Sequence, residues 1–334
     1  VATRVRSFLL GFADTLDKRR VKDEYGTSDR APDPVEVTRR PEPTVDPGKT
    51  PGSGDGWPMS REPDPIVTSI PEADQASIES VGKYFASRIE NPRRRVKALH
   101  DYVVLRLTYD EAALTLIERR DYRSVPSQQA EAVFAARTGV CEGYARLMVA
   151  LGKPAGVEIA YVTGYIRDAH RRVAPADSEA TLKSALEGYS HAWNAVKLDG
   201  HWFLLDATWD DPTGGPPTLE STYLLTPPEL FGLNHFPEEK AWQLVASPMS
   251  MGDFVRQPML SPRIGTFGLV LEDPKRSQVT VSGDVTITFD NPHGALMSAV
   301  AKVDGKGGKE TRCEVGPGAG GGAVEPWRHV VGCR

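Results

Sequence analysis

SHAWNAVKLDGHWFLLDATW, residues 190–209, consists of two runs of alternating apolar and polar residues joined by Asp199-Gly200. An Asp-Gly pair between two such runs is the strongest short-range signal for a β-hairpin with a two-residue turn. Across that turn Leu198 faces His201, and this register extends along both strands. The stretch therefore predicts an antiparallel strand pair with a defined set of facing residues.

The hairpin register brings a histidine and an aspartate together. It sets Trp193 opposite Asp206 and His191 opposite Thr208, so His191 and Asp206 share a face one diagonal step apart. Diagonal neighbours lie about 7–8 Å apart at the backbone, which an imidazole and a carboxylate can bridge. Asp210 is the other diagonal neighbour, but Asp211-Pro212 ends the strand there. The sequence predicts a His191–Asp206 pair, with Asp210 as the alternative.

Upstream of the hairpin, GVCEGYARLMVALG (139–152) predicts a helix with Cys141 in its first turn, ended by Gly152 and Pro154. The positive end of a helix and a nearby imidazolium both lower the pKa of a thiol. Backbone N–H groups of the same turn can hold an oxyanion. Cys141, His191 and Asp206 are thus candidates for a catalytic triad. Each also fits a plain structural role, and the residues alone leave both interpretations open.

These stretches, with LTYD (107–110) and AEAVFAARTGVC (130–141), resemble the core of the transglutaminase-like superfamily, thiol enzymes with a papain-like fold. The resemblance spans about residues 70–245. It implies that Cys141 is the nucleophile, His191 the base and Asp206 the orienting acid. The stretch after the core, at 223–245, resembles kyphoscoliosis peptidase-like proteins. Those proteins often add an immunoglobulin-like domain, which fits the alternating pattern after residue 264.

The oxyanion site does not follow the papain pattern. Ala135, rather than a glutamine, stands six residues before Cys141, and we expect Gln128 and Gln129 at the surface. The oxyanion would then be held by backbone N–H groups, with that of Cys141 as the first candidate. The tryptophans at 193, 202 and 209 are expected to pack the core or to line the cleft.

The predicted fold class is α+β: a papain-like transglutaminase-type core, with helices on an antiparallel sheet, followed by a small immunoglobulin-like β-sandwich. We expect an amphipathic helix over 1–26, a disordered Pro/Gly-rich linker over 27–65, the catalytic domain over 66–250 and the sandwich over 260–334. The run GPGAGGG (316–322) is expected to be flexible.

Composition excludes several function classes. The net charge of −5 comes without a concentrated basic run, so nucleic-acid binding is not expected. The apolar runs are too short for a membrane span. The histidines do not cluster with cysteines at metal-ligand spacing, so we predict no metal, and no organic cofactor. Cys313 and Cys333 either pair or are two buried thiols, and cytoplasmic and secreted locations both remain open, without a clear signal peptide.

The predicted function is acyl transfer from a peptide or side-chain amide of a protein or peptide substrate, through a thioester. Water is the default acceptor in an open cleft, which favours hydrolysis over amine cross-linking. The alternative is a non-catalytic protein-binding scaffold that keeps the fold. An amidase that removes sugars from proteins would also need a sugar-binding cleft, which the sequence does not indicate.

Overall fold

The computed structural model describes residues 56–167, 181, 186, 190–211, 219–277, 279–281, 283–302, 310–320 and 323–333. The chain divides into two compact units. The first, here the core unit, comprises Arg19–Ile166 and Ser184–Pro248; the second, here the C-terminal unit, comprises Val1–Lys18, Arg167–Lys183 and Met249–Arg334. The helix expected over 1–26 and the linker expected over 27–55 lie outside the described residues.

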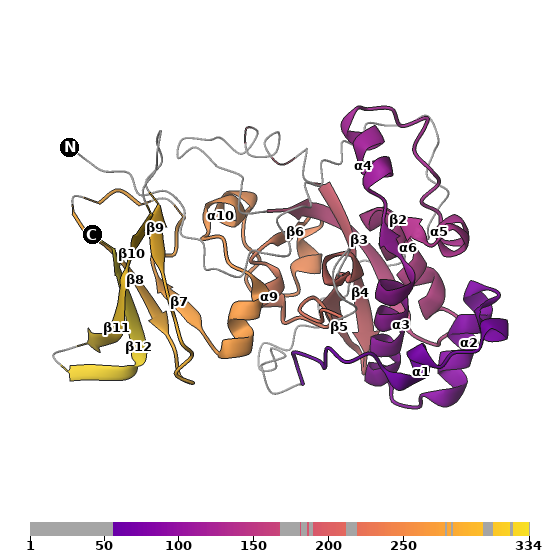
Figure 1. Cartoon of the computed structure of the whole chain (residues 1–334), viewed down its shortest axis with the longest axis horizontal. Helices are drawn as coiled ribbons and strands as arrows, with labels where there is room; N and C mark the ends of the chain where they lie inside the picture. The colour runs from indigo at the N-terminus through magenta and orange to yellow at the C-terminus, as the bar shows by residue number, and fades with distance from the viewer. Residues whose placement is uncertain are drawn as a thin grey trace. The chain divides into compact units, whose positions relative to one another are not determined.

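The helices of the core unit follow the apolar periodicity of the sequence. They are α1 Pro65–Thr68, α2 Ile78–Arg88, α3 Pro92–Arg106, α4 Glu111–Glu118, α5 Ala130–Ala136, α6 Cys141–Gly152, α8 Ala207–Asp210 and α9 Pro228–Phe231 (Figure 1). The side chain of Asn91 caps α3 by accepting the backbone N–H of Arg94 at 2.9 Å, and Pro92 takes the first helical position. In the described part of the chain, no helix has the length and apolar character needed to cross a bilayer.

The main sheet of the core unit is antiparallel, with strand order β5-β4-β3-β6. Its strands are β3 Glu158–Ile166, β4 Ser190–Leu198, β5 His201–Leu205 and β6 His235–Pro237, and a short parallel pair joins β1 Thr108–Tyr109 to β2 Thr138–Gly139.

The β4–β5 hairpin has the register predicted from the sequence. Leu198 pairs with His201, and Asp199 and Gly200 take φ values of 50° and 83°, as a two-residue hairpin turn requires. The ladder ends at the pair of Asn194 and Leu205, so the predicted pairing does not continue beyond that point. Thr208 is in α8 rather than in a strand opposite His191.

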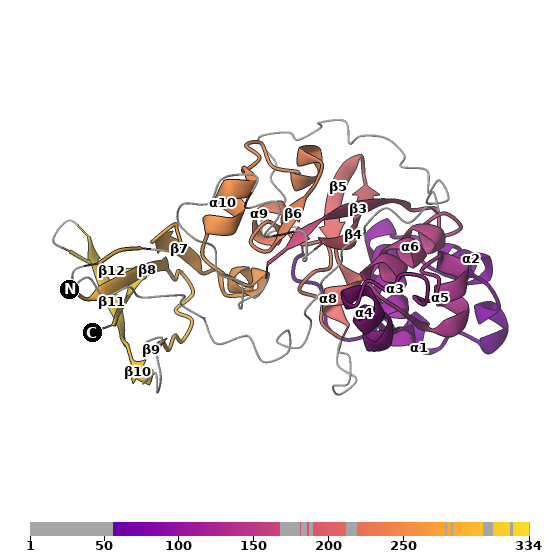
Figure 2. The ribbon, with the colours of Figure 1, turned by 90° about the horizontal axis from the view of Figure 1, so that it is seen from above.

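The two faces of this sheet have different partners. Helices α2, α3 and α6 gather on one side of it (Figure 2), and Val196 and Leu198 of β4 belong to the apolar cluster that these helices share. Asn194 ties α6 to this side, because its Nδ2 donates to the carbonyl oxygens of Ala145 and Ala160. Since side chains alternate along a strand, His191 and Trp193 point to the opposite face.

The end of the segment expected as a linker packs on α3. Trp57 and Asp64 are buried, and the carboxylate of Asp64 accepts a hydrogen bond of 2.7 Å from Nε of Arg94. The same carboxylate caps α1 through the N–H of Ile66. Residues 56–65 therefore differ from the disordered linker that the composition predicts, because an ion pair between buried Asp64 and half-exposed Arg94 and a helix cap hold them.

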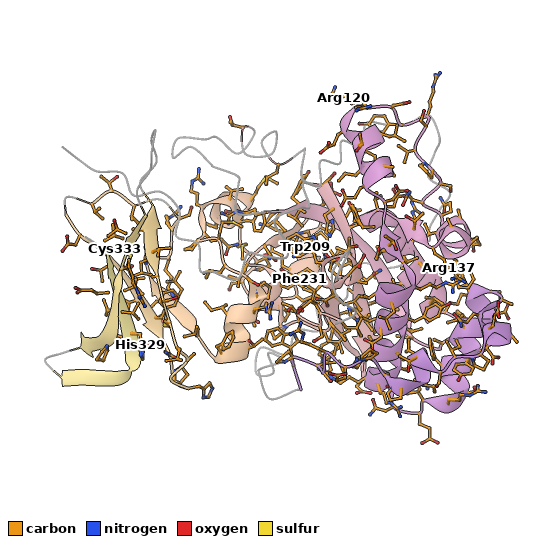
Figure 3. The ribbon with its side chains drawn as sticks, in the orientation of Figure 1. Arg120, Arg137, Trp209, Phe231, His329 and Cys333 are labelled. Atoms are coloured by element: carbon orange, nitrogen blue, oxygen red, sulfur yellow. A yellow bond between two sulfur atoms is a disulfide. The ribbon has the colours of Figure 1, made fainter. Side chains whose placement is uncertain are left out.

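The C-terminal unit contains a four-stranded antiparallel sheet, ordered β11-β12-β8-β7, and the pair β10-β9. Its elements are α10 Met251–Arg256, β7 Val270–Asp273, β8 Val285–Asp290, β9 Val300–Lys302, β10 Glu310–Arg312, β11 Glu314–Gly320 and β12 Ala323–Cys333. The prediction of a flexible run over 316–322 is wrong for 316–320, because β11 pairs there with β12. Cys313 and Cys333 form a disulfide (Figure 3), which decides between the two possibilities that the sequence left open.

Candidate active site

Cys141 is the first residue of α6 and is buried, with 1% of its surface exposed. The residue before it, Val140, has extended backbone dihedrals and no side-chain cap. The thiol therefore stands at the helix end where backbone N–H groups are not consumed within the helix. This is the position that the sequence predicts, and such a position stabilises a thiolate.

Gln128 is buried beside the start of α6, so the expectation of a surface residue is wrong. Its Oε1 accepts the backbone N–H of Val140 at 2.9 Å, and its Nε2 donates to the carbonyl oxygen of Pro126. A β-carbon on Gly143 would lie 2.6 Å from that Oε1. The glycine two residues after Cys141 thus leaves room for an amide that holds the backbone just before the thiol.

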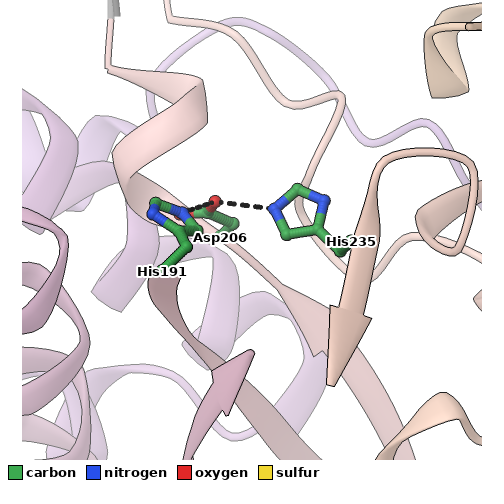
Figure 4. A group of neighbouring side chains, drawn as sticks. All are labelled: His191, Asp206 and His235. Carbon is green, nitrogen blue, oxygen red and sulfur yellow. Dashed lines mark hydrogen bonds and ion pairs between the residues drawn. The ribbon is translucent and has the colours of Figure 1, made fainter. Parts of the chain in front are cut away.

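His191 and Asp206 form a direct hydrogen bond. Nε2 of His191 lies 2.7 Å from Oδ2 of Asp206, and both residues are buried (Figure 4). The other carboxylate oxygen, Oδ1, caps α8 by accepting the N–H groups of Thr208 and Trp209 at 2.9 and 3.3 Å. The structure thus brings together the pair that the hairpin register predicts, while the catalytic roles of both residues stay a prediction.

The carboxylate of Asp206 is held in its ionised form. Burial alone would raise its pKa, but the charge and hydrogen bond of His191, followed by those of His235, outweigh burial. The pKa of Asp206 therefore lies well below its usual range. An ionised acid beside an imidazole fixes the tautomer of the ring and stabilises its protonated form.

Asp210, the alternative partner for His191, binds a different histidine. Its Oδ2 lies 3.1 Å from Nε2 of His100, whose Nδ1 lies 3.3 Å from Oδ1 of Asp101. Burial opposes a charge on His100, but the two carboxylates outweigh it and raise its pKa to about 9. Asp210 therefore anchors the end of α8 to α3 and leaves Asp206 as the acid next to His191.

A hydrogen bond of 2.6 Å links α6 to the region around α8. Oη of Tyr144, on the first turn of α6, donates to Oδ2 of Asp211, the residue that follows α8. This bond joins the start of α6, where Cys141 lies, to the end of the four-residue helix α8, whose N-cap is Asp206. Among the described residues Nδ1 of His191 is buried and makes no hydrogen bond.

A second histidine contacts Asp206, and sequence reasoning missed it. Nε2 of His235 lies 3.1 Å from Oδ2 of Asp206, and its Nδ1 lies 2.8 Å from Oδ1 of Asn234. Burial lowers the pKa of His235 to about 4, against the opposing effect of Asp206. His235 lies on β6, which pairs with β3 across a long stretch of chain. No local turn sets that register, so the sequence carried no signal for it.

Aromatic rings surround these side chains. Trp193 and Trp209 are buried, and their ring centroids lie 6.2 and 5.9 Å from that of His191. Trp202 contacts Trp242 instead. Two of the three tryptophans expected in the core or the cleft thus pack against the imidazole, where they exclude water and strengthen its interaction with Asp206.

The group of His191, Asp206 and His235 offers three metal-ligand atoms within 4.8 Å of one another. In the structure, however, both imidazoles point at one carboxylate oxygen over 2.7 and 3.1 Å, which are hydrogen-bond lengths. A proton on each ring nitrogen that faces Asp206 accounts for both distances. We therefore describe the group as hydrogen-bonded, and the absence of a metal and of an organic cofactor stays a prediction.

Comparison with known proteins finds a family similar to this region of the chain. The model of the Transglutaminase-like superfamily matches residues 79–207, which include α6, the β4–β5 hairpin and Asp206. The chain is 29% identical to kyphoscoliosis peptidase of Mus musculus and of Homo sapiens. Each alignment covers 204 residues, or 59% of this chain and 29% of the relative. The chain thus aligns with less than a third of the length of these relatives.

Among solved structures, the crystal structure of a TGase is 19% identical, covering 44% of this chain and 35% of that chain, with a TM-score of 0.30. A TM-score this low does not establish a shared fold. The family match and the observed helices and antiparallel sheet agree on an α+β papain-like core, and they support thiol-dependent catalysis in general. Residues 79–207 are thus similar to the transglutaminase-like superfamily, and the chain shares this similarity with kyphoscoliosis peptidase.

Proposed function

We propose that this protein transfers acyl groups from peptide or side-chain amides of a protein or peptide substrate, using Cys141, His191 and Asp206. The observation that carries the proposal is the 2.7 Å bond between Nε2 of His191 and the ionised Asp206. That bond leaves Nδ1 as the nitrogen that exchanges a proton with the thiol. The helix-start position of Cys141 and the Tyr144–Asp211 bond support the same assignment.

In the proposed reaction His191 takes the proton of Cys141, and the thiolate attacks the amide carbonyl carbon. The carbonyl oxygen becomes an oxyanion, which the N–H of Cys141 is placed to hold. Protonated His191 then gives its proton to the leaving amine as the C–N bond breaks, and a thioester remains. An acceptor attacks the thioester and passes its proton to His191, and the released sulfur regains a proton.

The acceptor decides whether the protein is a peptidase or a cross-linking enzyme. Water gives a carboxylic acid, so the overall reaction is amide hydrolysis; a primary amine gives a new amide. Water is abundant and needs no binding site, and we therefore propose hydrolysis as the main reaction. Incubation with a proteome digest and a labelled primary amine, followed by mass spectrometry, separates the two: new termini indicate cleavage and incorporated label indicates transfer.

The activated thiol is tested by alkylation with iodoacetamide. Cys313 and Cys333 are joined in a disulfide, so labelling without reductant reports on Cys141. We expect the wild type to label at pH 6–7 and the Cys141→Ala variant to show only background. An ordinary thiol reacts as it ionises near pH 8.5. A wild-type profile with that midpoint would count against an activated nucleophile.

The second candidate function is a non-catalytic protein-binding scaffold. The specific observation in its favour is burial, since Cys141, His191 and Asp206 are each at most 2% exposed. A scaffold of this kind would show the ordinary alkylation profile and would leave the digest unchanged. The same two experiments therefore distinguish the candidates.

We also propose that the C-terminal unit is a small immunoglobulin-like sandwich over 260–334 and that the catalytic domain spans 66–250. The antiparallel sheet β11-β12-β8-β7 supports the first assignment. Limited proteolysis is expected to release a stable fragment that contains residues 66–250 and retains the packed residues 56–65 at its N-terminal end. Cleavage inside the β4–β5 hairpin before any cut near 250 would contradict these boundaries.

A further inference from the structure

Asp206 lies between two imidazoles rather than beside one. Its Oδ2 is 2.7 Å from Nε2 of His191 and 3.1 Å from Nε2 of His235 (Figure 4). Its Oδ1 receives the N–H groups of Thr208 and Trp209. Four N–H directions thus converge on one carboxylate, which fixes its plane relative to the ring of His191.

The strand order explains how the second imidazole reaches this carboxylate. His191 on β4 pairs with Gly164 on β3, and Gly164 pairs on its other side with Pro237 on β6. Pro237 and His235 share a face because they are two residues apart. Gly164 carries no side chain, so the ring of Trp193 fills the space above β3 and the two imidazole centroids lie 5.7 Å apart.

The surroundings keep His235 neutral and in place. Its ring centroid lies 4.2 Å from that of Phe231 and 4.6 Å from that of Trp209. Trp193 and Tyr223 also contact the ring, at 5.2 and 5.4 Å. Such an enclosure excludes water. The burial disfavours a positive charge on His235 and outweighs the attraction of the ionised Asp206.

A neutral ring has one N–H, and the contacts decide which nitrogen carries it. Ionised Asp206 faces Nε2 and is a stronger acceptor than the amide of Asn234, which faces Nδ1. The proton therefore belongs on Nε2. The amide of Asn234 also contacts Oη of Tyr223 at 2.7 Å. In the structure Oδ1 of Asn234 faces Nδ1, and Nδ2 faces the tyrosine oxygen. Rotating the amide by half a turn keeps both partners and turns its N–H toward Nδ1, as a ring protonated on Nε2 requires.

We propose that His235 is a positioning residue of the active site, which donates its Nε2 proton to Asp206 and thereby holds the carboxylate against His191. This inference rests on the proposed function, because the orientation of His191 matters only if that ring exchanges a proton with Cys141. The role is distinct from catalysis itself, since His235 acts through Asp206 and need not touch substrate.

Three substitutions test the donor atom rather than the bulk of the ring. His235→Gln places an amide N–H near the position of Nε2, whereas His235→Asn places one near Nδ1, and His235→Phe offers no donor. We expect the alkylation rate of Cys141 at pH 6 to fall about 10- to 100-fold in the Asn and Phe variants, since small misplacements cost this much. The Gln variant is expected to stay within about threefold of the wild type.

Alkylation at pH 9.5 is the internal control. There every thiol is ionised without help from His191, so all four proteins should react at similar rates if access to Cys141 is intact. Equal pH 6 rates in wild type, His235→Asn and His235→Phe would overturn the role of His235 while leaving the proposed function standing. A wild type with an ordinary thiol profile would overturn both.

A second measurement reads the proton directly. In protein labelled with ¹⁵N-histidine, we expect His235 to show the Nε2–H tautomer at pH 7, with a signal that moves in the Asp206→Asn variant. A proton on Nδ1 would overturn the inference. So would a stoichiometric transition metal in the purified wild type that is lost in His235→Phe, because Asp206 would then bind a cation in place of the N–H group.

Discussion

Gly164 lies directly opposite His191 in the β3–β4 ladder, and a β-carbon there would lie 2.2 Å from the carbonyl oxygen of Phe236 on β6. The same atom would lie 2.4 Å from the ring of Trp193. Backbone cannot yield at such a distance, so Gly164→Ala must push β6, and His235 with it, away from β3. We expect a loss of about 1–3 kcal/mol in the free energy of unfolding, measured by urea denaturation.

Gly332→Ala is the matched control for Gly164→Ala. Gly332 is also a strand glycine, but no atom lies within 4 Å of the position that its β-carbon would take. We expect its stability and its alkylation profile to remain those of the wild type. Equal destabilisation by both substitutions would show that loss of glycine flexibility, rather than the contact with β6, is responsible.

Gln128 offers a test of the electrostatics at the nucleophile. Gln128→Glu keeps an oxygen acceptor for the N–H of Val140 but adds a negative charge beside Cys141, which disfavours the thiolate. We expect the alkylation midpoint of Cys141 to move to higher pH by about one unit. Gln129→Glu adds the same charge at the next residue, which is less buried, and should shift the midpoint much less. Equal shifts of the alkylation midpoint in the two variants would exclude a specific effect of Gln128 on Cys141.

Asp206 serves both the imidazole and the helix cap, and two substitutions separate these roles. Asp206→Asn keeps an oxygen for the N–H groups of Thr208 and Trp209 but removes the charge. Asp206→Ala removes both. We expect both variants to lose alkylation at pH 6, and the alanine variant to be less stable than the asparagine variant by about 0.5–2 kcal/mol. Urea denaturation measures the difference, and identical stabilities would mean that the cap contributes nothing.

The buried His100 makes stability depend on pH in the alkaline range. Its pKa in the folded protein is about 9, above the ordinary value of 6.5, so the folded state binds the extra proton between these values. The contribution of this proton to the free energy of unfolding is full below pH 6.5 and is lost as the pH rises through 9. Since each pKa unit corresponds to 1.36 kcal/mol, the loss is on the order of 3 kcal/mol.

His100→Gln checks this assignment. Glutamine keeps hydrogen-bonding capacity toward Asp210 and Asp101 without a titrating proton. We expect the variant to be less stable than the wild type at pH 7 and to lose the slope in stability between pH 7 and 9.5. Urea denaturation at several pH values measures both effects. A wild type whose stability is flat over that range would contradict a buried imidazolium.

The parts of the site that follow from local sequence were predictable, and those that depend on distant strand pairing were not. Asp199-Gly200 sets the register of one hairpin as far as the pair of Asn194 and Leu205. Asp206 follows Leu205 directly, and its carboxylate contacts His191 there. His235 reaches the same carboxylate through the β3–β6 pairing, in which Ile166 faces His235 across 69 positions of chain. No turn specifies such a register, since packing of the whole unit decides it.

The burial of Gln128 and the pairing of His100 escaped sequence reasoning for the same reason. A glutamine before a helix and a histidine within one are ordinary surface residues by composition. Their partners, the N–H of Val140 and the carboxylate of Asp210, are set by how α5, α6 and α8 pack. By contrast, the start of α3 could be predicted from the sequence, because Asn91-Pro92 is a local capping signal.

The Cys313–Cys333 disulfide has a consequence for the third cysteine of residues 1–334. An oxidised cysteine is usually rescued when a neighbouring thiol condenses with its sulfenic acid. With the other two sulfurs already joined, Cys141 has no resolving partner within these residues. Recovery of the Cys141 thiol after reaction with peroxide must therefore use a thiol or reductant supplied by another molecule.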